Sequence, residues 1–136
     1  MSPTAIVRGA RAAGLDLIAV TDHNSARNSA VFARLCEEAG LACLHGLEAC
    51  TVEEIHVLCL FPRLEQALDL SEFIRERLPP VPWVEGKMGD QVYVNEQEEI
   101  EGWETLFLGS GARVTLTDLG ERVLAAGGWF IPAHVD

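Results

Sequence analysis

The sequence has no long apolar segment, no basic cluster and no signal-peptide pattern. Its apolar runs fall short of the roughly 18 residues that a membrane-spanning helix needs, so we expect a protein of the cytoplasm that does not enter a membrane. Lys and Arg number 10 against 21 Asp and Glu, which gives a formal net charge of −11. Because the basic residues are scattered, this composition argues against binding to a nucleic-acid backbone.

The cysteines also lack the spacing of a redox or zinc motif. No C-x-x-C pair occurs among the four, which lie in apolar segments at Cys36, Cys43, Cys50 and Cys59. We therefore interpret them as buried thiols in a reducing compartment. With 136 residues, of which 49% are hydrophobic and 23% charged, the chain has the composition of one globular domain with its own core.

Helical and strand-like segments alternate along the chain. Helices are predicted over residues 2–14, 25–39, 63–78 and 115–128, and buried strands over 15–21, 41–51, 55–61 and 129–133. Residues 91–108 are predicted to form a hairpin or an insertion. Continuous apolar runs of strand length are typical of parallel strands buried on both faces. The pattern predicts an α/β fold with parallel strands, as either an open sheet or a (β/α) barrel.

Polar side chains stand at the edges of these strands. Asp22 and His23 follow the first strand directly, in the stretch VTDHNS, while Glu48, His56 and His134 lie at the edges of three others. Imidazole and carboxylate groups are ligands of borderline divalent cations such as Zn, Mn or Fe(II), and Asp22 is a natural acceptor for the ring N–H of His23. The spacing leaves two interpretations open: a metal site, or buried polar residues that cap strand ends.

The stretches GLDLIAVTDHNS, GLEACTVEEIHVLCLF and GGWFIPAHVD resemble, in this order, motifs of the polymerase and histidinol phosphatase (PHP) family. The resemblance implies part of a distorted (β/α)7 TIM-like barrel of the PHP type, with two or three divalent metal ions at its C-terminal mouth. There a metal-bound hydroxide attacks a phosphate ester. By this resemblance the metal ligands are His23, Glu48, His56 and His134, and the catalytic residues are Asp22 and His23. Glu48 bridges two ions, and His56 and His134 join it on one of them.

The family's opening H-x-H strand and late D-x-H strand have no counterpart among the four histidines of this sequence. We therefore interpret residues 1–136 as a single PHP-like domain that is incomplete at both ends, and we expect phosphoesterase activity of the longer parent more than of this chain. An incomplete barrel would expose apolar strand edges and favour a homo-oligomer. The acidic composition favours a small phosphorylated metabolite or a nucleotide as substrate.

Two alternatives remain at this stage: a non-catalytic PHP-like module that binds metal or supports a partner, and a metal-dependent amidohydrolase-like enzyme on a similar barrel. His45 is expected to be structural, because in an extended strand it faces away from Glu48. The acidic run NEQEEIEGWE, residues 95–104, is interpreted as a solvated face. Asp136, close after His134, is a further candidate for contact with metal or substrate.

Overall fold

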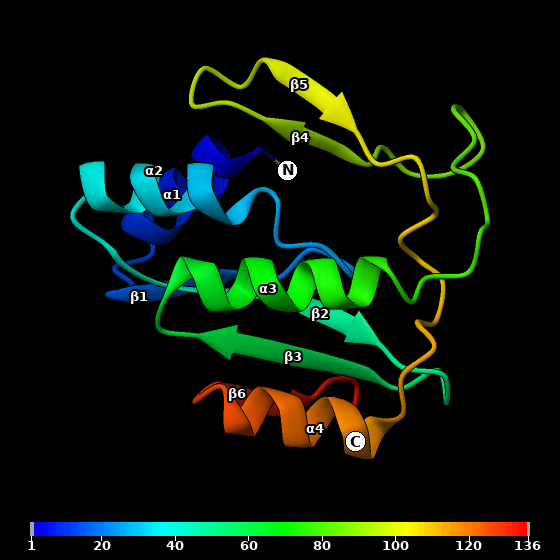
Figure 1. Ribbon diagram of the computed structural model, residues 1–136. Helices are drawn as coiled ribbons and strands as arrows, with labels where there is room; N and C mark the ends of the chain where they lie inside the picture. Colours follow the sequence, from blue (N-terminus) through cyan, green and yellow to red (C-terminus); the bar gives the residue numbers. More distant parts are fainter. Residues whose placement is uncertain (1, 136) are drawn as a thin grey trace.

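A computed structural model describes residues 2–135 as a mixed α/β fold (Figure 1). In chain order its elements are α1 (Pro3–Ala12), β1 (Leu17–Val20), α2 (Ser29–Glu38), β2 (Ala42–Cys50), β3 (His56–Phe61), α3 (Leu64–Arg75), β4 (Val92–Val94), β5 (Ile100–Trp103), α4 (Leu116–Ala125) and β6 (Trp129–Pro132). One sheet has the strand order β1-β2-β3-β6, and β4 and β5 form a separate hairpin. No helix within this range has the length and apolar character needed to cross a membrane.

The helices begin and end close to the residues that the sequence predicts, with one correction. Ser2 caps α1 by accepting a hydrogen bond from the Ala5 backbone N–H at 3.4 Å, and Gly40 ends the second helical segment in a left-handed conformation at φ 67°. The second helix, however, begins at Ser29 and not at Ser25. The Ser25 hydroxyl instead accepts from the Arg27 backbone N–H at 3.3 Å, so these residues form a turn before the helix.

The expectation of an all-parallel sheet is wrong. Strands β1 and β2 are parallel, but β3 is antiparallel to both β2 and β6. The reason is the short connection of residues 51–55, because a parallel crossover needs a dozen or more residues. Strands β1, β2 and β6 therefore run in one direction and β3 in the other. Within residues 2–135 the sheet is open, with β1 and β6 at its edges, and it does not close into a barrel.

The two faces of this sheet differ in what covers them. One face packs against α3 and α4, which lie in front of β2, β3 and β6 in Figure 1. Side chains on that face form the main core and are fully buried, among them Leu47, Val57 and Phe61. The opposite face is also apolar, yet Leu17 and Trp129 are 53% and 49% exposed there. The sheet therefore has one helix-covered face and one uncovered apolar face.

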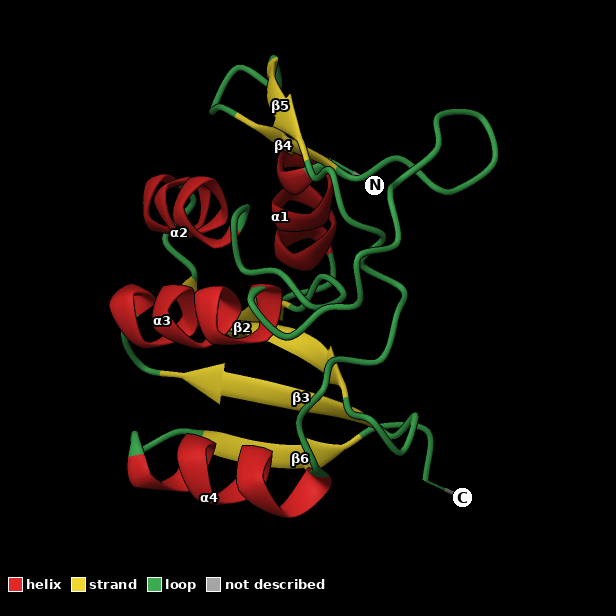
Figure 2. Ribbon diagram, turned by 45° about the vertical axis from the view of Figure 1, so that its right-hand side comes forward, coloured by secondary structure: helices red, strands yellow, loops and turns green. Residues whose placement is uncertain are grey.

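A second, smaller core lies between α1, α2 and the first two strands, around the buried Phe32 and Cys36. The β4–β5 hairpin lies beyond α1 and α2, on the side away from β3 and β6 (Figures 1 and 2). Asn28 fastens this hairpin to the start of α2, because its side chain donates to the Val92 carbonyl and accepts from the Val94 N–H, each at 3.2 Å. The hairpin is thus held beside the residues that follow β1.

The four cysteines are free thiols, and three of them are buried, at Cys36, Cys50 and Cys59. Burial raises the pKa of the Cys59 thiol to about 12, since an apolar environment disfavours the thiolate. A thiol of this kind stays protonated and unreactive near neutral pH. Cys59 therefore behaves as a small core residue on the helix-covered face.

Candidate metal centre

The strand directions bring the predicted ligands to one edge of the sheet. Strands β1, β2 and β6 all end there, and β3, which runs the opposite way, begins there. His23 comes just after β1, Glu48 lies near the end of β2, His56 is the first residue of β3 and His134 comes just after β6. The reversed strand thus contributes its first residue to the edge at which the other three strands end.

Backbone pairing between the strands fixes the positions of these four residues relative to one another along the strand direction. His23 and Glu48 form a parallel bridge that continues the pairing of β1 with β2 beyond Val20. On the other side of β2, the register pairs Cys50 with His56. The Ala133 N–H donates to the His56 carbonyl at 2.8 Å, which holds the chain before His134 against β3. All four residues are therefore held by the backbone hydrogen bonds that join neighbouring strands.

The side chains converge on a single oxygen, Oε1 of Glu48. His56 Nδ1 lies 2.7 Å from it, His134 Nε2 lies 3.4 Å away and His23 Nδ1 lies 3.9 Å away. The His56 ring is in the middle, since its centroid is 5.2 Å from that of His23 and 5.6 Å from that of His134. One carboxylate oxygen is thus surrounded by three imidazoles from three other strand ends.

These positions fit a divalent metal ion. With bonds of about 2.0–2.2 Å, neighbouring ligand atoms around a tetrahedral ion lie about 3.3 Å apart. The donor atoms of His23, Glu48 and His56 all lie within 4.8 Å of one another. Shifts of about half an ångström would bring the separations of 2.7 and 3.9 Å to that value. Two imidazoles and a carboxylate also have the chemistry that Zn, Mn and Fe(II) accept.

His134 occupies a different position from the other three predicted ligands. It approaches Glu48 beside His56, has a left-handed backbone at φ 55°, and its side chain is 75% exposed. The resemblance implies that His56 and His134 share an ion with Glu48, apart from His23. In the structure the compact donor group instead joins His23 to Glu48 and His56, with His134 adjacent. Asp136, the other candidate near this end, lies outside the described residues.

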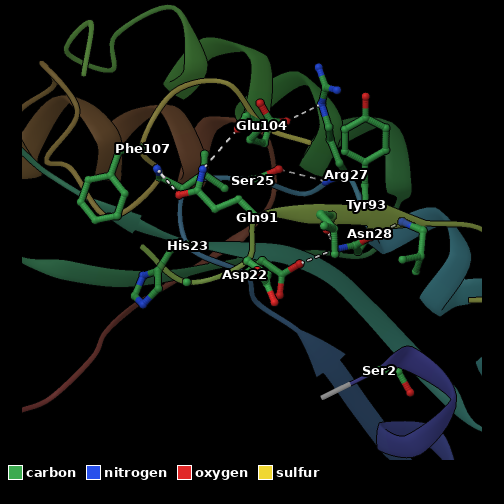
Figure 3. Close-up of a pocket in the computed structure, with 16 residues that line it drawn as sticks. Ser2, Asp22, His23, Ser25, Arg27, Asn28, Gln91, Tyr93, Glu104 and Phe107 are labelled. Carbon is green, nitrogen blue, oxygen red and sulfur yellow. Dashed lines mark hydrogen bonds and ion pairs between the residues drawn. The ribbon is translucent and has the colours of Figure 1, made fainter. Parts of the chain in front are cut away.

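Asp22 does not orient His23 as expected. Its carboxylate accepts a hydrogen bond from Asn28 Nδ2 at 3.0 Å. Figure 3 shows Asp22 directed towards Asn28, with the His23 ring pointing elsewhere. The reason is the alternation of an extended chain, in which adjacent side chains point to opposite sides. The Asp22 backbone carbonyl accepts from the Glu48 N–H at 3.0 Å, but its carboxylate is directed away from the His23 ring.

His45 faces the helix-covered side of β2, as its odd spacing from Glu48 requires, and takes no part in the donor group. Burial lowers the pKa of its imidazole, despite the opposing influence of Glu65. A partly buried, neutral histidine under the helices is a structural residue. It provides a natural control for the three histidines at the sheet edge.

A cavity of about 640 Å³ opens beside the ligand group and has Asp22 and His23 in its wall. The hairpin and the segment after it supply the facing wall, including Tyr93 and Phe107 (Figure 3). Arg27 also lines this cavity, with its guanidinium 4.9 Å from the centre of the Tyr93 ring. Such a volume is that of a site for a small organic ligand.

The sequence did not single out the charged pair of this cavity. Arg27 Nε lies 2.7 Å from Glu104 Oε1, and the Glu104 side chain is only 7% exposed. Glu104 ends the acidic run for which the sequence predicts a solvated face, and this prediction is wrong at that residue. The pairing partner of Glu104 is far away along the chain, and nothing in the local sequence distinguishes it from the neighbouring acidic residues.

No protein-family model matches the chain, and no curated protein matches it. Among solved structures, the chain is similar to a "putative metal-dependent phosphoesterase" from Bifidobacterium adolescentis, with 28% identity over 56% of this chain and a TM-score of 0.45. The matched part is 28% of that protein's chain, and the TM-score is too low to define a shared fold. What supports a metal centre is therefore the geometry of this chain's own side chains.

Proposed function

We propose that this chain carries the metal centre of a PHP-type phosphoesterase, which hydrolyses the phosphate ester of a small metabolite or a nucleotide. The observation that supports the proposal is the convergence of His23, His56 and His134 on Glu48 Oε1 from four separate strand edges. Side chains that only capped strand ends would bond to nearby backbone groups. These side chains point at one another, and two of the rings are more than half exposed.

The residues present have distinct roles in such a site. His23, Glu48 and His56 would hold a divalent ion. Such an ion would lower the pKa of a bound water molecule and polarise the phosphoryl group. The negative charge of Glu48 compensates part of the charge of that ion. The cavity beside His23 would hold the rest of the substrate, with the aromatic face of Tyr93 and the guanidinium of Arg27 as contacts. A cavity of this size suits a small phosphorylated molecule better than a polymer.

We also propose that the sheet belongs to a distorted (β/α)7 barrel in a longer parent protein, with two or three ions at its mouth. The helices cover one face of the sheet, while the uncovered face is apolar and carries Leu17, Trp129 and Ile131 half exposed. In a barrel such a face points inwards and is buried by the remaining strands. The ligand group lies at the edge where three strands end, the position of barrel active sites.

Metal content and turnover together test this proposal. We expect elemental mass spectrometry to find about one tightly bound divalent ion per chain after reconstitution with Zn, Mn or Fe(II). The longer parent, loaded with metal in the same way, should hydrolyse p-nitrophenyl phosphate above the rate of the free ion, and a chelator should abolish this rate. Metal binding without turnover would favour the non-catalytic module. A chain that binds no ion under any of these conditions would refute the metal centre itself.

A further inference from the structure

Asn24 is the fourth residue after β1, and it is almost completely buried at 1% exposure. Its backbone is left-handed at φ 52°, a conformation that asparagine tolerates better than most residues. It follows His23 directly, and its hydrogen-bond partner Leu108 lines the cavity. We propose that Asn24 is the positioning residue that sets His23 and Glu48 relative to each other and joins both to the cavity wall. This inference rests on the metal centre proposed above.

On one side, Asn24 makes two hydrogen bonds to the end of β2. Its backbone N–H donates to the Glu48 carbonyl at 2.9 Å. Its side-chain Oδ1 accepts from the Cys50 backbone N–H, also at 2.9 Å. These two bonds hold the chain at Glu48 and just beyond it, so they restrain the residue whose carboxylate lies at the centre of the ligand group. Since His23 is the preceding residue, these two hydrogen bonds also limit movement of His23 relative to Glu48.

On the other side, Asn24 holds the segment that forms a wall of the cavity. Its Nδ2 donates to the carbonyls of Leu108 and Ser110 at 2.7 and 2.8 Å. Leu108 and its neighbour Phe107 line the cavity. A single buried side chain therefore connects the metal-binding strand ends with a segment more than 80 residues further along the chain.

The chemistry of the site requires a carboxamide. The side chain must offer one acceptor to a backbone N–H and two donors to backbone carbonyls, which asparagine alone supplies at this length. Aspartate keeps the acceptor but places an oxygen against the two carbonyls. Glycine tolerates the positive φ and removes all three side-chain bonds, leaving the buried Cys50 N–H without its partner.

The test measures zinc affinity of the whole chain by titration calorimetry, with Asn24→Gly compared with wild type. Removal of a group that orients metal ligands typically costs about 10- to 100-fold in affinity, and we expect a loss in this range. Asn95→Gly is the matched control, because the Asn95 side chain also bonds to backbone groups, accepting from the N–H groups of Gln97 and Glu99, but none of these partners is a proposed metal ligand. Its zinc affinity should stay within about twofold of wild type, since it orients no metal ligand.

Folded Asn24→Gly protein that binds zinc as tightly as wild type would overturn the inference while leaving the metal centre intact. Failure of the wild type to bind zinc would instead refute the proposed function. If Asn24→Gly does not fold, hydrogen exchange of residues 106–111 in metal-free Asn24→Asp decides the matter. We expect exchange at least about tenfold faster than in wild type, because the two donor bonds to this segment are lost. Unchanged exchange there would overturn the inference.

Discussion

Replacement of His56 by alanine removes the ring in the middle of the ligand group. Its Nδ1 is the donor atom closest to Glu48 Oε1, at 2.7 Å, and its ring contacts those of both His23 and His134. No other described side chain in the compact donor group replaces it. We therefore expect His56→Ala to abolish tight metal binding, whereas His45→Ala should leave it in place.

The expected magnitude follows from the number of ligands. A protein site with four ligands binds Zn²⁺ with about 10–16 kcal/mol at neutral pH, which is about 2.5–4 kcal/mol for each ligand. Since 1.4 kcal/mol corresponds to a factor of ten, loss of one ligand lowers the affinity by about 60- to 700-fold. His45 lies on the opposite face of β2, so its removal affects packing under the helices and not the donor group.

Calorimetric titration with zinc, supported by elemental analysis after dialysis, measures this difference. Circular dichroism of both metal-free variants checks that each retains the wild-type fold. If His45→Ala loses metal as completely as His56→Ala, the assignment of ligands by strand edge is wrong. If neither variant loses metal, the ion binds elsewhere on the chain, and the same conclusion applies.

Two further substitutions test the fold beneath the site. Leu47→Ala should lower the free energy of unfolding, measured in urea, by about 2–5 kcal/mol, because Leu47 is fully buried in the main core. Leu124→Ala, at a largely exposed position, should lower it by less than about 0.5 kcal/mol. The raised pKa of Cys59 makes stability fall as pH rises above 9.0, because the unfolded thiol then ionises and the folded thiol does not. Between pH 8 and pH 10 wild type should lose about 1.4 kcal/mol more than Cys59→Ala, and equal losses in the two proteins would show that Cys59 ionises normally.

The placement of the four candidate ligands at strand edges could be predicted from the sequence because it depends on local features. The apolar runs place His23, Glu48, His56 and His134 at strand edges, and strand parity separates His45 from Glu48. The direction of β3 was missed, although the short connection over residues 51–55 indicates an antiparallel hairpin. That error changed the expected sheet without moving His56 from the edge, because a reversed strand begins where its neighbours end.

The cavity could not be predicted in the same way. Its charged pair joins Arg27 to Glu104 across most of the chain, and such a pairing leaves no periodic signal in the sequence. Asn24 presents the same difficulty, since its partners Leu108 and Ser110 lie more than 80 residues further along the chain and no sequence pattern indicates this contact. Asp22 shows the converse limit, because its position beside His23 suggested a contact that the alternation of the chain prevents.

The β2–β3 hairpin also bears on how the site assembles during folding. Glu48 and His56 are eight residues apart on this hairpin and are joined by a 2.7 Å contact. Hairpins form in about 1–10 μs, whereas closure of longer loops and packing of helices follow more slowly. We therefore expect Glu48 and His56 to meet before His23 and His134 arrive from more distant segments. A metal ion present during folding would meet a two-ligand half-site first, and its capture would favour the arrival of the remaining rings.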